Sequence, residues 1–595
     1  MICANVKVSE IIRPHLFYHD ADGALMEGLD DEGALKSACD CIKLGRVVAV
    51  KDLGGFHLCC RIDDEELVKS LRKRKHRDAK PFAVMCKDLA AARRFCEISE
   101  AEESVLCGTV KPIVLLKKKD KSALCHISEN SRLGVMLPYT PLHHLIFDGL
   151  GDIDSLVMTS ANLSDRPIIC KNDEALTDLF GIADGFLLND RDIQMRCDDS
   201  VLWVIDGKEY YVRRSRGYVP FPLTLNADAG AILACGAEQK ASFCLSKGCH
   251  VFPSQHIGDL KNLETLENYE EQIARFEKLF DIKPELIACD LHPDYMSGEY
   301  AEEKAKAEGL PLVRVQHHHA HMASCMADNG IDEACMGVIW DGSGYGSDGS
   351  VWGGEFLAGD AAGFERLGRI AHIRLPGGDR AVKEIDRLAL SLLLDAGLDT
   401  SLLHFDPAYA AQIERQLSAG INCPKASSMG RLFDGVAAIL GIKHTASYEG
   451  QGAVLLESEA EEGIEDSYPV SIAEQDGMFI FEYAPMLSAL LSDLKGGKSR
   501  GECAARFMNT LVAMAAEMCV RIREKTGLAK LMLSGGSFQN IYVLSRLMRV
   551  LKEQGFEPYC HRRVSCNDEG ISLGQINVAA HSSEFSRLRK IQEEE

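Results

Sequence analysis

Leu312-Val313-Arg314-Val315-Gln316-His317-His318-His319-Ala320-His321 is the stretch from which we interpret this chain, because a strand-like apolar run leads there into residues with helical spacing. His317 and His321 stand four residues apart, so they project from one face of the predicted helix. Four of the 19 His fall within these last five positions, and burying so many imidazoles requires a partner for every ring nitrogen. The spacing therefore predicts a divalent metal site, whereas His318 and His319 lie off the ligand face and either line a pocket or pack.

Length and composition indicate a globular protein of two or three domains. The chain has 595 residues, of which 46% are hydrophobic and 26% are charged, and one core cannot organise that length. We find no apolar run long enough to cross a bilayer and no signal peptide. The 22 Cys are scattered without any Cys-x-x-Cys pair, which favours reduced thiols. We therefore expect a cytoplasmic protein without a membrane partner.

The charge distribution argues against nucleic-acid binding. The formal net charge is -23, and phosphate backbones attract basic surfaces. Residues 71–80 nevertheless hold six Lys and Arg directly before a predicted strand at residues 81–85, and a second Arg cluster lies at residues 213–216. The alternative for the first cluster is a charged helix end, but we favour phosphate binding, because two distant Arg clusters can clamp one polyphosphate.

The first 226 residues contain two further motifs with small polar groups. Residues 1–30 have weak periodicity and are predicted to be a lead-in or a linker remnant, and helical spacing then begins near Glu32. A buried strand at residues 46–50 leads into Lys51-Asp52-Leu53-Gly54-Gly55-Phe56-His57-Leu58, and a later one leads into Thr159-Ser160-Ala161-Asn162. Hydroxyl and amide groups in such places hold phosphate oxygens or cap a helix.

Taken together, these motifs resemble the YrdC-type domains, which make a carbamoyl-type adenylate from ATP. The resemblance is carried by Lys51 to Leu58, Lys75-x-Arg77-x-x-Lys80-Pro81-Phe82, Thr159 to Asn162, and Arg213-Arg214-x-Arg216-Gly217-Tyr218. It implies a YrdC-like α/β domain over residues 31–226 that uses ATP with Mg. It also implies a nucleotide and carbamate site, with the residues Lys51, Lys75, Arg77, Lys80, Ser160, Asn162, Arg214 and Arg216.

A second domain is predicted over residues 230–580, followed by a charged C-terminal tail at residues 581–595. It opens with a strand at 231–234, a turn at 236–240 and a returning strand at 242–245. A comparable strand, glycine-rich turn and strand recur at residues 336–356, which indicates a duplicated fold. The arrangement resembles the actin-like ATPase superfamily, with its RNase H-like domains, in which such turns lie against nucleotide phosphates.

Polar residues at the ends of strands supply the candidate site of this domain. A turn between a strand and a helix directs backbone N–H groups at an anion, and the predicted nucleotide-binding residues are Gly342, Ser343, Gly344, Asp434, Ser534, Gly535, Gly536 and Asn540. Asp341 and Asp568 join the two histidines as predicted catalytic and metal-binding residues: His317, His321, Asp341 and Asp568. Two imidazoles and two carboxylates suit iron or zinc better than magnesium.

The second domain resembles the TsaD-like carbamoyl- and threonylcarbamoyltransferases through His317-x-x-x-His321, the Asp341 hairpin, Ser534-Gly535-Gly536 and Asn567-Asp568-x-Gly570. With the YrdC-type domain before it, nearly the whole chain resembles the HypF family of hydrogenase-maturation carbamoyltransferases. That resemblance implies that carbamate becomes carbamoyl-AMP and that the carbamoyl group passes to the C-terminal cysteine of the partner HypE. The product is a thiocarboxamide, which later becomes cyanide on the iron of NiFe hydrogenase.

Members of that family usually begin with an acylphosphatase domain and two Cys-x-x-Cys zinc modules, which we do not find in this sequence. We expect either a shortened chain or a second protein that releases carbamate from carbamoyl phosphate. Three other functions stay open. O-carbamoylation of a small-molecule hydroxyl belongs to relatives with the opposite domain order, threonylcarbamoyl transfer to tRNA conflicts with the negative charge, and a non-catalytic actin-like ATP-binding scaffold predicts no transition metal.

Overall fold

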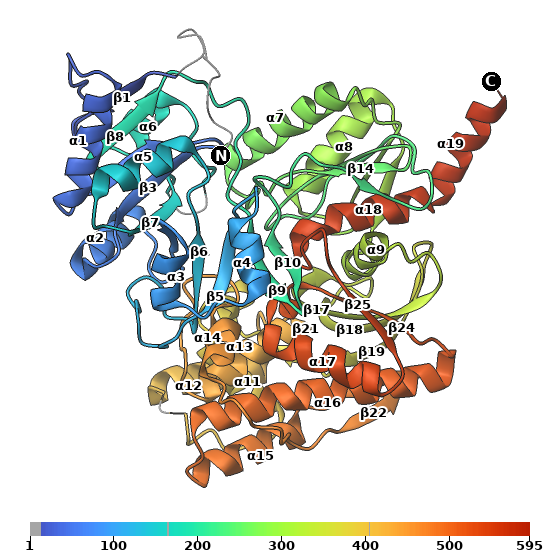
Figure 1. Ribbon diagram of the computed structural model, residues 1–595. Helices are drawn as coiled ribbons and strands as arrows, with labels where there is room; N and C mark the ends of the chain where they lie inside the picture. The colour runs from blue at the N-terminus through green and yellow to red at the C-terminus, as the bar shows by residue number, and fades with distance from the viewer. Residues whose placement is uncertain (1–13, 164–165, 404, 595) are drawn as a thin grey trace. The chain divides into compact units, whose positions relative to one another are not determined.

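The computed structural model describes residues 14–163, 166–403 and 405–594. The chain forms two compact units, of which the first comprises residues 1–201 and 215–217 and the second comprises residues 202–214 and 218–595. Both units combine helices with mixed sheets (Figure 1). The predicted α/β class is confirmed.

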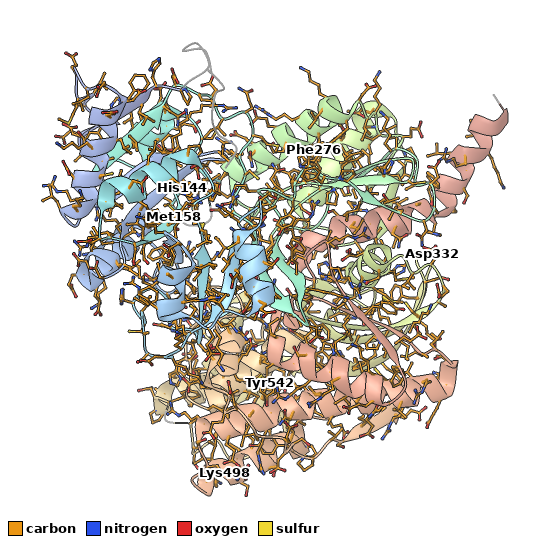
Figure 2. The ribbon with its side chains drawn as sticks, in the orientation of Figure 1. His144, Met158, Phe276, Asp332, Lys498 and Tyr542 are labelled. Atoms are coloured by element: carbon orange, nitrogen blue, oxygen red, sulfur yellow. The ribbon has the colours of Figure 1, made fainter. Side chains whose placement is uncertain are left out.

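The first unit is built on a mixed sheet with the strand order β1-β8-β2-β3-β7-β4-β6-β5. Strand β2 is parallel to β8 and β4 is parallel to β6. Asp30 caps helix α1, because its side chain accepts from the backbone of Gly33. The helix buries Ala34, Ala38 and Ile42 in the same core as Met158 of β7 (labelled in Figure 2). The strands are β1 (Leu16–His19), β2 (Val48–Lys51), β3 (Phe56–Arg61), β4 (Ala83–Cys86), β5 (Ile113–Lys117), β6 (Arg132–Met136), β7 (Ser155–Ser160) and β8 (Gly185–Asn189), and the helices are α1 (Asp31–Lys43), α2 (Glu65–Lys75), α3 (Leu89–Phe95), α4 (Glu100–Cys107), α5 (Pro141–Leu150) and α6 (Asn172–Asp178).

The predicted lead-in contributes to this sheet. Strand β1 pairs antiparallel with β8, with Leu16 opposite Asn189, and Tyr18 is buried in the core. A strand of four residues is too short to show a period in the sequence, which explains why the stretch was interpreted as a linker. The first thirteen residues of the predicted lead-in lie outside the described residues.

The second unit contains the same sheet pattern twice, which confirms the predicted duplicated fold. In the first repeat the order is β14-β13-β12-β15-β16, and in the second it is β19-β18-β17-β24-β25. In each, the first three strands are antiparallel neighbours and the last three are parallel neighbours. The strands of the two sheets are β11 (Leu223–Thr224), β12 (Ile232–Ala234), β13 (Cys244–Lys247), β14 (His250–Pro253), β15 (Leu286–Asp290), β16 (Leu312–Val315), β17 (Cys335–Tyr345), β18 (Val351–Gly359), β19 (Phe364–Ile370), β20 (Ile373–Arg374), β21 (Lys425–Ser428), β22 (Ile472–Gln475), β23 (Met478–Phe481), β24 (Lys530–Ser534) and β25 (Glu557–Cys560).

Helices cover these sheets and separate the two repeats. Helices α9 and α18 pack against each other (Figure 1), Phe276 of α7 meets Phe243 edge to face, and the Tyr542 hydroxyl of α17 donates to Asn509 of α16 (Figure 2). The helices are α7 (Leu263–Phe280), α8 (Met296–Glu308), α9 (His317–Asn329), α10 (Asp379–Lys383), α11 (Asp386–Asp395), α12 (Pro407–Ala419), α13 (Met429–Ile439), α14 (Gln451–Glu459), α15 (Ala484–Lys495), α16 (Arg500–Thr526), α17 (Ile541–Glu553), α18 (Ile571–Ala580) and α19 (Ser583–Glu594), with the short 3-10 turns η2 (Gly536–Gln539) and η3 (Asp568–Gly570).

Two boundaries of the units differ from the expectation. The hairpin of β9 (Val201–Ile205) and β10 (Lys208–Arg213) belongs almost entirely to the second unit, because Tyr210 is buried with Trp340 and donates from its hydroxyl to the Phe538 carbonyl oxygen at 3.1 Å. The predicted charged tail contains helix α19, whose Phe585 is buried in the core of the first repeat. Tyr210 and Phe585 are both flanked by charged residues in the sequence, so local composition does not indicate that they are buried.

Helix α16 is long and apolar enough to cross a membrane by length and composition, contrary to the expectation that no such run exists. Its apolar window is 78% buried inside the protein. That burial is typical of a core helix, because both its faces pack against protein.

Gly574→Ala is expected to lower the free energy of unfolding of the second unit by about 1–3 kcal/mol, because an added Cβ would lie 1.8 Å from the Ala320 carbonyl oxygen and would force α18 away from α9. All three Trp of the chain lie in this unit, so urea unfolding followed by their fluorescence measures the change. Gly363→Ala, where a Cβ meets no atom within 4 Å, is the matched control, and equal stability of the two variants would contradict the prediction.

Candidate functional site

Four predicted metal-binding side chains converge in the second unit. His317 and His321 come from the start of α9, Asp341 from β17 and Asp568 from the first residue of η3, and one possible ligand atom from each lies within 4.8 Å of all the others. The Nε2 atom of His317 is 3.4 Å from Asp341 Oδ2 and 3.8 Å from Asp568 Oδ1, and Nε2 of His321 is 3.9 Å and 3.7 Å from the same two atoms.

This geometry fits a metal ion of the zinc or iron type. Ligands at about 2.1 Å from a tetrahedral ion lie about 3.4 Å apart, close to the spacing of these atoms. The Nε2 atoms of His317 and His321 are buried and have no hydrogen-bond partner within the described part of the chain, and an unpaired buried polar atom is costly. A cation between the two histidines and the two carboxylates would satisfy all four groups.

Asp290, at the end of β15, is a further candidate residue of this site that the sequence did not reveal. Its Oδ2 accepts from Nδ1 of His317 at 2.8 Å, and both side chains are fully buried. This bond directs the proton to Nδ1 and leaves Nε2 free to bind a metal. The available signal was an apolar strand, Leu286-Ile287-Ala288-Cys289, that ends in a carboxylate.

The carboxylates control the charge of this centre. Burial alone lowers the pKa of His317, but Asp290, then Asp341 and Asp568, outweigh it and raise that pKa well above its ordinary value. For Asp341, burial raises the pKa, but the nearby imidazoles of His317 and His321 outweigh it and hold the pKa well below its ordinary value. Ionised carboxylates thus face the imidazoles.

The other two histidines of the motif have separate surroundings. Nε2 of His319 lies 2.7 Å from the Asp360 carbonyl oxygen, so this ring packs. His318 is fully buried, and its Nδ1 is 3.4 Å from the Gln316 amide nitrogen. A Cβ on Gly344 would lie 2.6 Å from both imidazoles, His317 and His318, so Gly344 makes room for the histidines, whereas the sequence analysis assigned it to the nucleotide.

The glycine turn after β24 supports Asp341. Gly535 has a φ of 103°, and a Cβ there would lie 2.2 Å from the Trp340 carbonyl oxygen. The Gly536 backbone N–H donates to Asp341 Oδ1 at 2.9 Å. Two predicted nucleotide contacts have partners within the protein: Ser534 Oγ lies 2.8 Å from His561 Nε2, and Asn540 caps α17 by accepting from the backbone of Val543.

Charged side chains surround Gly342 beside this centre. The Ser428 hydroxyl donates to the Gly342 carbonyl oxygen, and a Cβ on Gly342 would lie 3.5 Å from the Arg431 guanidinium. Arg431 is 3.1 Å from the predicted residue Asp434, whose pKa burial raises. Lys240 pairs with Glu449; burial lowers the pKa of Lys240, but the charges of Glu449, Asp568 and Asp341 raise it overall. The neighbouring Ser343 is exposed. The surroundings of Gly342 therefore combine the cationic side chains of Arg431 and Lys240 with a backbone that an anion can approach.

In the first unit the structure brings together Lys75, Ser160 and Asn162. Lys75, which is 1% exposed, donates to the carbonyl oxygens of Ser160 and Asn162 and to Asn162 Oδ1, at 2.6–2.7 Å. Burial, followed by repulsion from Arg77 and Lys80, lowers the pKa of Lys75 well below its ordinary value. Arg77 lies beside it and donates to the carbonyl oxygens of Lys80 and Pro81.

The other predicted residues of the first site have different neighbours. Lys51 donates to the Asn189 carbonyl oxygen of β8, and burial lowers its pKa. Arg214 belongs to the second unit, where its guanidinium donates to the carbonyl oxygens of Tyr218 and Phe221 and is 4% exposed. Arg214 thus holds its own neighbouring backbone in place, and its role in nucleotide binding stays a prediction.

Arg216 joins a buried charge network that the sequence analysis did not predict. Its Nε donates to Asp199 Oδ1 at 2.6 Å, and Asp199 Oδ2 is 3.0 Å from Nε2 of His57. Asp52 Oδ2 lies 3.6 Å from Nδ1 of His57 and 3.2 Å from Nε2 of His143. The network joins the loop after β2 to the strand and loop residues that carry Arg216, so it fixes the backbone around the first site.

Comparison with known proteins gives matches along nearly the whole chain. Family models match residues 40–215 ("Telomere recombination", the Sua5/YciO/YrdC family), 227–328 ("HypF Kae1-like domain") and 337–575 ("Carbamoyltransferase, Kae1-like Domain, second subdomain"). A carbamoyltransferase HypF of Synechocystis is 38% identical over 93% of this chain and 74% of its own length, and one of Rhodobacter capsulatus is 40% identical over 94% and 74%. The crystal structure of a full-length HypF in the phosphate- and nucleotide-bound form matches with a TM-score of 0.90, at 42% identity, over 96% of this chain and 74% of that chain.

Asp290→Asn is expected to weaken Zn²⁺ binding by roughly tenfold to a hundredfold, because the loss of this carboxylate leaves the orientation and basicity of His317 unsupported. Competition with a chromogenic chelator at fixed pH measures the affinity. Asp294→Asn, an exposed change in the loop that follows, is the matched control. Equal affinities of the two variants would show that Asp290 has no such role.

The stability of the first unit is expected to fall toward both acid and alkaline pH. Burial raises the pKa of Asp199, but Arg216 and His57 outweigh it and lower that pKa, so the stabilisation is present above about pH 4 and is lost as the pH falls through the folded-state pKa. Burial lowers the pKa of His57, but Asp199 and Asp52 outweigh it and raise that pKa, so its stabilisation is present below about pH 6.5 and is lost as the pH rises through the folded-state pKa.

Hydrogen exchange of the β3 and β7 amides, corrected for intrinsic rates, measures this profile. His57→Gln is expected to flatten the alkaline decline because the titrating group is gone. His144→Gln, at an exposed position (labelled in Figure 2), is expected to keep it. An unchanged alkaline decline in His57→Gln would rule out His57 as its source.

Proposed function

Because the chain belongs to the HypF family of carbamoyltransferases, we propose that it forms carbamoyl-AMP in its first unit and transfers the carbamoyl group in its second. The acceptor is the C-terminal cysteine thiolate of a HypE partner in hydrogenase maturation, in the cytoplasm. Carbamate and ATP with Mg are the substrates of the first reaction, and carbamoyl phosphate is the distal source of carbamate.

The first reaction is the attack of a carbamate oxygen on the α-phosphorus of ATP, which yields carbamoyl-AMP and pyrophosphate. The group formed by Lys75, Ser160 and Asn162, with Arg77 and Lys80 beside it, supports this assignment. Cations with fixed positions stabilise the negative charge that moves onto the leaving pyrophosphate. Lys75 holds the Ser160–Asn162 backbone in place, and the neighbouring basic groups attract the triphosphate.

The second reaction is supported above all by one observation, the convergence of His317, His321, Asp341 and Asp568 on a common centre. These four side chains would hold an Fe or Zn ion, which would supply Lewis-acid stabilisation of negative charge at an acyl-adenylate oxygen. The thiolate sulfur forms a bond to the carbamoyl carbon, and the bond from that carbon to the AMP oxygen breaks, so that AMP leaves. Asp290 keeps the proton of His317 on Nδ1, and Lys240 and Arg431 supply positive charge near Gly342 for the phosphate of the adenylate.

Enclosure of the centre favours transfer over hydrolysis. His317, His321 and Asp341 are all buried, so bulk water has little access to a carbonyl held beside them. A carbamoyl adenylate hydrolyses in water, and a site that excludes solvent preserves it for the acceptor. A protein acceptor with a flexible C-terminus reaches such a site more readily than a rigid surface does.

The partial reactions are expected to separate by mutation. His321→Ala should reduce transfer of labelled carbamoyl to a HypE partner by roughly two orders of magnitude or more while ATP–pyrophosphate exchange with carbamate continues, because one ligand of the centre is lost. Lys75→Met should reduce the exchange itself. His444→Ala removes an exposed histidine of the second unit and serves as the control that retains both activities.

Three results would contradict the proposal. Absence of carbamate-dependent exchange in the wild-type chain would exclude carbamoyl-AMP formation. Equal loss of both partial reactions in His321→Ala would exclude separate sites. Carbamoyl transfer to a small-molecule hydroxyl, with none to the C-terminal cysteine of the partner, would favour the alternative acceptor.

A further inference from the structure

A buried serine, a histidine and an aspartate contact one another in a row near the candidate metal centre. Ser534 is the last residue of β24, His561 follows β25, and Asp328 is near the end of α9. Ser534 Oγ is 2.8 Å from His561 Nε2, and His561 Nδ1 is 3.7 Å from Asp328 Oδ2. Their order matches that of a nucleophile, a base and an orienting acid.

Burial excludes a nucleophilic role for this serine. Ser534 has no exposed surface, and His561 is 1% exposed, whereas a nucleophile must be reached by its substrate. Asp328 is held in turn by the backbone N–H groups of Arg562 and Arg563 and by the Arg563 side chain. Asp328 is thus fixed in place, and His561 lies between it and Ser534, so the three residues form an internal support.

The duplication of the fold shows what is supported. In the first repeat, Asp290 ends β15 and its carboxylate bonds to His317, which follows β16. In the second repeat, Ser534 ends β24 and its hydroxyl bonds to His561, which follows β25. Strands β15 and β24 occupy the same place in their sheets, so the two pairs are equivalent. The first pair orients a metal ligand directly, and the second stands directly before the turn that contacts another ligand.

That turn has no side chains of its own to fix it. Gly535 and Gly536 follow Ser534, the Gly535 N–H donates to the Cys566 carbonyl oxygen at 2.9 Å, and the Gly536 N–H donates to Asp341 Oδ1 at 2.9 Å. Oδ2 of Asp341 is thereby left toward His317 and His321. Ser534 is the nearest side chain before the two glycines, so its hydrogen bond limits the movement of the turn.

We propose that Ser534, His561 and Asp328 are positioning residues that hold the Gly535-Gly536 turn so that its N–H group orients the Asp341 carboxylate for the metal. This inference rests on the metal centre of the proposed function. It assigns to the second repeat the supporting role that Asp290 has in the first. Outer partners of this kind typically change metal affinity by about tenfold to a hundredfold.

The test compares Zn²⁺ affinities of full-length variants by chelator competition. Ser534→Ala and His561→Leu are each expected to weaken binding by roughly tenfold or more, and the double variant by no more than the stronger single variant, because both remove the same support. His561→Gln keeps a side-chain oxygen that can accept from Ser534 and is expected to retain more affinity than His561→Leu. Ser391→Ala is the matched control, since Ser391 is also fully buried and donates to the Arg374 carbonyl oxygen.

The outcomes separate this inference from the proposed function. A wild-type chain that binds no Zn²⁺ would overturn the metal centre itself. A wild-type chain that binds Zn²⁺, with Ser534→Ala and Ser391→Ala equal in affinity, would overturn the positioning role alone. Thermal unfolding identifies any variant that does not fold and removes it from the comparison. Among the folded variants, a His561→Leu affinity equal to that of wild type rejects the proposal. If His561→Leu does not fold, the comparison of Ser534→Ala with Ser391→Ala decides the question.

Discussion

The second unit depends on the burial of two imidazoles whose Nε2 atoms have no partner within the described residues. Such burial is unfavourable unless a further group binds these nitrogen atoms. The surrounding residues nevertheless hold the two imidazoles in this buried position. Gly344 leaves room for the rings, Asp290 fixes the proton of His317, and two carboxylates from distant segments face the same space. A preorganised site requires this unfavourable burial. It also requires glycines that make room for the imidazoles and carboxylates that face them, which is why both concentrate at these strand ends.

The duplicated fold makes that convergence possible. Each repeat ends two parallel strands at the same edge of its sheet, and α9 and α18 pack so closely that Gly574 meets the Ala320 backbone. Polar residues at strand ends therefore approach one another from both repeats. Asp290 and Ser534 occupy equivalent positions at the ends of their strands but carry different groups. The Asp290 carboxylate contacts the candidate metal ligand His317, whereas the neutral Ser534 hydroxyl stands beside the Gly535-Gly536 turn. The repeats have thus kept one geometry and diverged in chemistry.

The sequence was informative where function is concentrated in local patterns. His317 and His321 on one helical turn, and Asp341 and Asp568 beside glycines, were named before their proximity was known, and the doubled hairpins predicted the duplicated fold. Contacts between distant residues were not accessible in this way. The Asp52, His57 and Asp199 network joins residues up to 147 positions apart, and the bond between Ser534 and His561 depends on sheet order. The contacts of Arg214 were equally inaccessible, because an Arg cluster does not reveal to which unit each member belongs.

Buried unpaired polar atoms do not by themselves identify a metal centre. In the first unit, Asp52 Oδ2 and both ring nitrogens of His143 are also buried without a hydrogen-bond partner in the described chain, yet Asp52 and His143 face each other across 3.2 Å. Two such groups can be accommodated side by side without a metal ion. In the second unit, two imidazoles and two carboxylates converge on a common point, and each of the four groups offers an atom that can bind a metal ion. A cation can contact all four groups at once, whereas one protein side chain reaches at most part of the set, and that convergence distinguishes the candidate metal centre from the network of the first unit.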